Sequence, residues 1–186
     1  MSLKIEYMMN RILIIISFLI NVLSYSQNNS EAEVFKKVID YEIERGSKGI
    51  YIQCEKYKTS YDLKEFKEET RLNIPENILN EIEINKSKSS NGIWNSELIN
   101  GLNYDSNFIK SKKCLTYNEV QRLFKETNTY QHILSISEPI FDNGYENCVV
   151  SVSFSTFTHS SYGNSYFLKK VYGVWVIINS YAFWMT

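Results

Sequence analysis

The fold is decided by residues 142–155, which read DNGYENCVVSVSFS. Asp142-Asn143-Gly144 is a strong signal for a tight turn between two strands. After the turn, Val150, Val152 and Phe154 alternate with serines at positions 151, 153 and 155. Strict alternation of apolar and polar residues is typical of a strand with one dry face and one wet face. The stretch therefore predicts a strand that follows a hairpin turn and lies half in the core.

Further strands are predicted on both sides of this one. Residues 133–136 and 139–141 are short extended pieces, and residues 166–171 lead into a second turn at Tyr172-Gly173. Residues 174–184 form a long strand that is apolar on both faces, a pattern typical of a central or covered strand. We therefore expect an antiparallel meander of three to five strands in the C-terminal half, with Phe154 and Trp175 in its core.

The N-terminal half is predicted to be largely helical. Residues 30–45 carry apolar residues at helical spacings, and Ser30 can cap this helix while Gly46 can end it. Pro75 can begin a second, shorter helix. Residues 116–119 read TYNE, a capping box. A third helix should follow it as far as Thr127, and it should bury Val120, Leu123 and Phe124.

These elements predict an α+β fold in which the helices pack on one side of the sheet. The chain has 186 residues, and one domain per roughly 150 residues is the usual expectation. Residues 85–92 are rich in Ser, Lys and Asn and predict a mobile loop. This loop is a poor domain boundary, because neither half would hold both layers. We expect one domain over residues 27–186.

The first 26 residues are predicted to be a secretory signal peptide. Lys4 and Arg11 precede an apolar run over residues 12–23, and small residues follow before Gln27. The run is shorter than the roughly 20 residues needed to cross a bilayer core. We expect cleavage after Ser26 and a secreted or periplasmic protein. The alternatives are an uncleaved membrane anchor and a buried N-terminal helix.

The three cysteines are Cys54, Cys114 and Cys148. In an oxidising compartment one disulfide and one leftover thiol are possible, and the sequence does not choose among the three pairings. We prefer three free, buried cysteines to a bridge. The spacing contains no CxxC, so it does not support a zinc site.

Charge and motifs exclude several classes of function. The formal net charge is −1, which leaves no basic field for a nucleic acid. The sequence lacks the glycine-rich nucleotide motifs, HExxH, GxSxG and an EF-hand loop. We therefore expect no cofactor, no metal and no nucleic-acid partner, and contact with a membrane only through the signal segment.

The C-terminal third resembles uncharacterised secreted proteins of Bacteroidetes-type bacteria. The resemblance rests on Ser137-x-Pro139-x-Phe141, on the strand that follows, and on Lys170 with Gly173-x-Trp175. It covers about 50 residues and implies a cystatin-like or NTF2-like sheet, in which a curved antiparallel sheet wraps a helix. It implies no catalytic residues.

The candidate binding element is residues 156–165, predicted as a polar loop too long for an ordinary hairpin. Binding residues commonly lie on loops that a rigid scaffold holds. Aromatic side chains near this loop, together with Phe183 and Trp184, suit a peptide or a sugar. The candidate ligand-binding residues are Thr158, His159, Ser160, Tyr162, Asn164 and Tyr166.

The leading functional hypothesis is a non-catalytic secreted or periplasmic domain that binds a peptide, protein or other ligand through its sheet. One alternative is a hydrolase that uses His159 with a nearby serine or carboxylate. Another is an inhibitor or immunity-type partner protein, which fits the same size and compartment. We predict no catalytic residues and no metal ligands.

Overall fold

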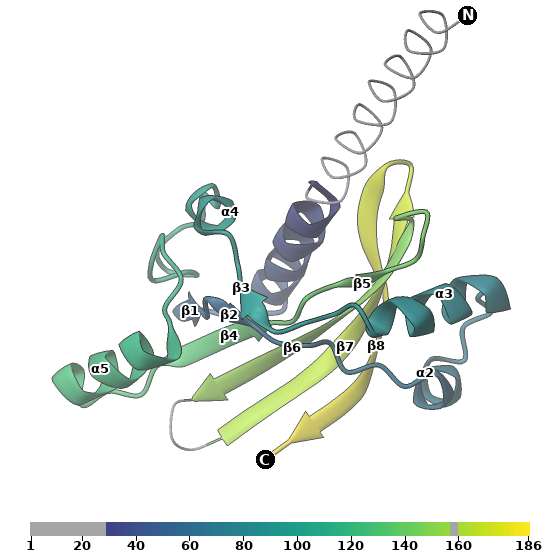
Figure 1. Cartoon of the computed structure of the whole chain (residues 1–186). Helices are drawn as coiled ribbons and strands as arrows, with labels where there is room; N and C mark the ends of the chain where they lie inside the picture. The colour runs from purple at the N-terminus through teal and green to yellow at the C-terminus, as the bar shows by residue number, and fades with distance from the viewer. Residues whose placement is uncertain (1–28, 157–159) are drawn as a thin grey trace, which may run out of the picture.

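The computed structural model describes residues 29–156 and 160–186. The predicted signal peptide, residues 1–26, lies outside the described residues. The fold is α+β, and its main sheet has six strands in the order β1-β4-β6-β7-β8, with β5 paired to β6 (Figure 1). The sheet strands are β1 Ile50–Ile52, β4 His132–Ile136, β5 Ile140–Phe141, β6 Asn147–Thr156, β7 Ser160–Val171 and β8 Val174–Met185. The expected three to five strands were too few, because the short strand β1 joins from the N-terminal half.

The sheet is antiparallel except at β1, which pairs in parallel with β4. The turn at residues 142–144 joins β5 to β6, as predicted, and β6 and β7 pair from Asn147 opposite Lys169 to Thr156 opposite Ser160. Phe154 and Trp175 are buried, which confirms the predicted core residues.

Helices cover both faces of the sheet, whereas the sequence predicted one covered face. The described part of the N-terminal helix spans residues 29–44 and packs Phe35 and Val38 against Val150 of β6. On the second face, α2 (Leu63–Thr70) and α3 (Glu76–Lys86) pack against Val149 of β6 and Phe167 of β7. The second face is apolar at this end of the strands only, because serines replace valine further along β6.

The helix ends follow local chemistry. Gly46 has a φ of 101°, a left-handed conformation that glycine adopts without strain, and it ends the first helix as predicted. Asn29 is already helical, so Ser30 lies inside this helix and is not its cap. The capping box of Thr116 and Glu119 is present and begins α5 (Tyr117–Thr127). Of its three predicted core residues, Val120 is buried and the other two are half-buried.

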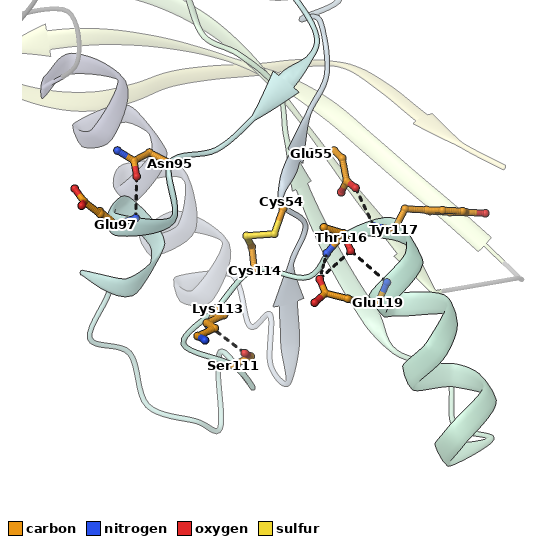
Figure 2. The surroundings of a disulfide bond; sticks show 10 residues. All are labelled: Cys54, Glu55, Asn95, Glu97, Ser111, Lys113, Cys114, Thr116, Tyr117 and Glu119. Atoms are coloured by element: carbon orange, nitrogen blue, oxygen red, sulfur yellow. Dashed lines mark hydrogen bonds between the residues drawn. A yellow bond between two sulfur atoms is a disulfide. The ribbon is translucent and has the colours of Figure 1, made fainter.

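A disulfide joins Cys54 to Cys114, and Cys148 keeps a buried free thiol. The preference for three free cysteines was therefore wrong. Figure 2 shows the bond between the end of β1 and the start of α5, where the Tyr117 amide also donates to Glu55 at 3.0 Å. A parallel bridge between Gln53 and Leu115 aligns the two segments. This alignment decides which two cysteines form the disulfide. It joins residues far apart in the sequence, so the sequence alone could not predict it.

The remaining elements are short. Strands β2 (Glu55–Lys56) and β3 (Gly92–Ile93) pair with each other, and α4 (Ser96–Asn100) follows. The predicted mobile loop over residues 85–92 begins with the last two residues of α3 and ends in β3.

Strand β8 is an edge strand, not the central or covered strand that its sequence suggested. Trp175 faces the N-terminal helix and is buried, while Val174, Val176 and Ile178 are 64%, 37% and 41% exposed. Apolar residues on both faces of a strand predict cover on both. Here one of the two faces is covered and the other is partly open.

Candidate functional site

A groove of about 490 Å³ opens on the second face of the sheet, next to α2. We call it the serine groove. Its floor is formed by β6 and β7, one wall by α2 and the loop before it, and the other wall by the end of β8. The lining residues are Tyr57, Ser60, Glu65, Ser151, Val152, Ser153, Ser165, Ala182, Phe183 and Trp184.

The floor of the serine groove is a patch of hydroxyl groups. Ser151 lies opposite Ser165 in the sheet, and their Oγ atoms are 2.8 Å apart. The hydroxyl of Tyr57 reaches the same patch, where it donates to Ser153 Oγ at 3.4 Å and to the Ser151 carbonyl at 3.5 Å. Burial raises the pKa of Tyr57, so its hydroxyl stays protonated and remains a donor.

Gly163 allows an aromatic side chain to lie against this floor. It pairs with Ser153 on one side and with Trp184 on the other. A Cβ atom at this position would come within 2.7 Å of the Trp184 ring and 2.5 Å of the Val152 carbonyl oxygen. The indole therefore lies over a position without a side chain. Trp184 is 41% exposed and can still meet a ligand.

The end of β8 is held in an unusual conformation beside the groove. Ala182 has a φ of 52°, in the left-handed region that non-glycine residues seldom adopt. Its amide donates to a carboxylate oxygen of Glu69 on α2 at 2.6 Å. This contact fixes the end of β8 against α2, and Phe183 and Trp184 follow directly in the wall of the groove.

Glu65 is the one acidic or basic residue among the described residues that line the serine groove. It lies in the first turn of α2. Its carboxylate makes the groove unfavourable for an anion. The combination of hydroxyls, an indole and a carboxylate suits a neutral or cationic ligand.

The predicted site residues are not brought together in this groove. Thr158 and His159 lie outside the described residues. Ser160 is the exposed first residue of β7, and Tyr162 is 43% exposed and stacks on Phe154. Tyr162, Asn164 and Tyr166 alternate along β7 on the face of the N-terminal helix, which is the opposite face of the sheet.

Asn164 and Tyr166 have structural partners. Asn164 donates to Ser180 Oγ at 2.9 Å. Tyr166 is fully buried, donates its hydroxyl to the Glu42 carboxylate and accepts a bond of 3.0 Å from Arg45. Burial raises the pKa of both Tyr166 and Glu42. These contacts join the N-terminal helix to the sheet.

The prediction of a long loop over residues 156–165 was wrong. Thr156 lies directly opposite Ser160, and pairing continues to Ser165, so residues 160–165 belong to β7. Gly and Asn have low strand propensity, and the serines around them add no apolar alternation. Their strand conformation here comes from pairing with β6 and β8, which the local sequence does not reveal.

Sequence reasoning missed Tyr57, Glu65 and the floor serines as site residues. A signal for the floor was present, because the alternation of valine and serine predicted a wet face on β6. No local pattern linked Tyr57 or Glu65 to that face, since the loop and α2 reach it only through the tertiary fold.

A second hollow of about 200 Å³ has Lys48, His132 and Tyr162 among its lining residues. Among the described residues, no group of three or more His, Cys, Asp or Glu side chains could hold a metal ion. No helix in the described part of the chain is long and apolar enough to span a membrane.

Comparison of the chain with protein-family models, with curated proteins and with solved structures finds no match in any of the three.

Proposed function

We propose that this chain is a secreted or periplasmic, non-catalytic domain that binds a peptide, protein or other ligand through its sheet, and that the serine groove is where it does so. The observation that carries the proposal is the hydroxyl floor directly beside the exposed ring of Trp184. The volume of about 490 Å³ falls within the range of roughly 300 to 1,000 Å³ that is usual for ligand sites.

A sugar or an extended peptide segment fits the chemistry of the serine groove. Both ligands have an apolar surface that can stack on an indole and polar edges that can bond to hydroxyl groups. Ser153 and Tyr57 offer such hydroxyls, and Glu65 can accept from a ligand hydroxyl or amine. A neutral ligand would need no counter-charge, and a cationic group of a ligand could pair with this one carboxylate.

The lining supports binding more than hydrolysis. Glycoside cleavage uses two carboxyl groups about 5 to 9.5 Å apart, whereas Glu65 is the single carboxylate among the described lining residues. The groove has serine hydroxyls but no histidine among these residues to act as their base.

We also propose a particular kind of α+β fold. We place the chain with cystatin-like or NTF2-like sheets, since its N-terminal helix lies against one face of a mostly antiparallel sheet. The apolar segment at the N-terminus supports a secreted or periplasmic location.

Tryptophan fluorescence can test binding in the groove directly. Trp94 and Trp175 are 3% and 2% exposed, so a change in the polarity around Trp184 dominates any shift in emission. We expect chitotetraose, as a sugar probe, or pooled octapeptides, as a peptide probe, to shift the emission to the blue. Each probe would be titrated to about 1 mM, which reaches weak binding.

Ser153→Leu is the informative variant, because the larger side chain would fill the floor of the groove. We expect it to remove the blue shift. Ser106→Leu makes the same change on an exposed loop away from the groove and should respond like the wild-type protein. Absence of a shift with either probe, or an equal shift in Ser153→Leu, would contradict binding at this site.

A further inference from the structure

We propose that the first half of β8, residues 174–178, pairs with the same segment of a second copy of this chain. This segment is separate from the serine groove. Strand β8 lies at one end of the sheet order, where the described residues pair it with β7 alone (Figure 1). At the other end, the edge of β1 is covered, because Ile50 forms a bridge to Ile109, and Gln53, directly after β1, forms one to Leu115.

Strand β8 pairs regularly with β7 from Val174 to Ile177, and its first register shift falls at Ile178, between the pairs Leu168–Ile177 and Phe167–Asn179. The strand reads VWVIINSYAFWM and contains no charged residue and no proline. Natural edge strands avoid pairing with other chains by placing lysine or proline on the edge, by a bulge, or by a covering element. The uncharged edge over residues 174–177, which is free of register shifts, is therefore a template for another strand.

The two halves of β8 differ in how they are covered. In the second half, the amide of Ala182 is occupied by Glu69, and Asn179 donates to the Thr70 carbonyl at 3.4 Å. These contacts shield that half with α2. In the first half, Val174, Val176 and Ile178 are 64%, 37% and 41% exposed.

The free half is suited to a copy of itself. An antiparallel pair centred on Val176 places Val176 opposite its own copy and Val174 opposite Ile178. Every such pair is apolar, whereas a charged partner strand would lose hydration against these side chains. Five residues are also a typical length for a strand.

Electrostatics do not oppose this arrangement. The formal net charge of each copy is only −1. Lys169 lies opposite Val176 in β7. In the pair, the two copies of Lys169 would be three strand spacings apart, about 14 Å at roughly 4.8 Å each. This distance exceeds the Debye length of about 8 Å at physiological ionic strength, so their repulsion is screened.

Sedimentation equilibrium of the purified protein from about 5 to about 200 µM tests the proposal, because dimerisation depends on concentration. We expect the wild-type protein to approach twice its monomer mass, which is 21.9 kDa for the full chain of 186 residues. Val176→Lys places like charges opposite each other and should weaken the dimer by about tenfold or more. Ile84→Lys adds the same charge at a position that is 66% exposed on α3 and should leave the dimer unchanged.

Circular dichroism would confirm that each variant is folded. If Val176→Lys does not fold, Val174→Lys serves instead, since Val174 is more exposed. A wild-type protein that stays monomeric, which would leave the edge to a strand of another protein, overturns the proposal. So does a dimer that survives both lysine variants, or one that Ile84→Lys dissociates equally.

Discussion

Gly163 is the residue on which the shape of the serine groove depends most directly. We expect Gly163→Ala to cost about 1 to 3 kcal/mol of the free energy of unfolding, as overpacking typically does, because its Cβ would lie 2.5 Å from a backbone oxygen. The same atom would move the Trp184 ring into water, so the emission should shift to the red. Urea unfolding and fluorescence measure the two effects.

Gly92→Ala is the matched control for this substitution. Gly92 also lies in a strand, but the nearest atoms to its added Cβ would be side-chain carbons of Lys56, the closest at 3.1 Å, and not backbone. We expect little change in stability and none in the emission of Trp184. Equal behaviour of the two alanine variants would show that Gly163 does not hold the ring in place.

Glu42 should make stability depend on pH. Burial is the main cause that raises its pKa above 4.5, although the bond from Tyr166 and the charge of Arg45 act in the opposite direction. The folded protein therefore holds this proton more tightly than the unfolded chain. As pH rises from about 4.5 through the raised pKa, the free energy of unfolding falls.

Glu42→Gln removes this dependence. We expect its stability relative to the wild-type protein to rise over that pH range, as measured by urea unfolding at several pH values. Glu44→Gln changes an exposed residue of the same helix and should leave the slope as it is. A wild-type slope in Glu42→Gln would assign the pH dependence to another group.

At the scale of elements, the disulfide should contribute much of the stability of the N-terminal half. Cys54 and Cys114 are separated by 60 positions, and closing a loop of that length stabilises the folded state by about 4 kcal/mol in the chain-entropy model. We expect the Cys54→Ser, Cys114→Ser double variant to lose about this much in urea unfolding.

Thiol titration provides the control for that loss. The denatured wild-type protein should show one reactive thiol before reduction and three after it. The native protein should show almost none, because burial raises the pKa of Cys148 and hides its sulfur. Two or more reactive thiols before reduction would contradict the bond.

The elements that the sequence predicted well are those with a strong local signal. Each of these signals lies within a few neighbouring residues: the turn at residues 142–144, the alternation in β6 and the capping box before α5. The hairpin to β7 was misjudged because serine, glycine and asparagine take strand conformation there through their neighbours. The exposure of β8 was missed for the same reason, since local hydropathy does not show which strand ends the sheet.

At the scale of the whole molecule, the α+β class was predictable but the layering was not. A period of two in β6 indicates one dry face, yet Val149 and Phe167 give the second face its own small core under α2 and α3. The serine groove exists because this second core stops partway along the strands. Its residues come from four distant parts of the chain, so no single stretch of sequence could reveal it.

The crosslink between Cys54 and Cys114 also changes how far the chain must search to complete its sheet. Strand β1 pairs with β4 through Ile50 and His132, which are separated by eighty-odd positions along the backbone. Once the bond has formed, the shortest covalent path between them is roughly the 4 residues before Cys54 and the 18 after Cys114. The entropic cost of bringing the two strands together is therefore lower, by about 1 kcal/mol of free energy, than in the chain without the bond. An oxidising compartment would thus help the one parallel pairing in the sheet to form, in addition to stabilising it afterwards.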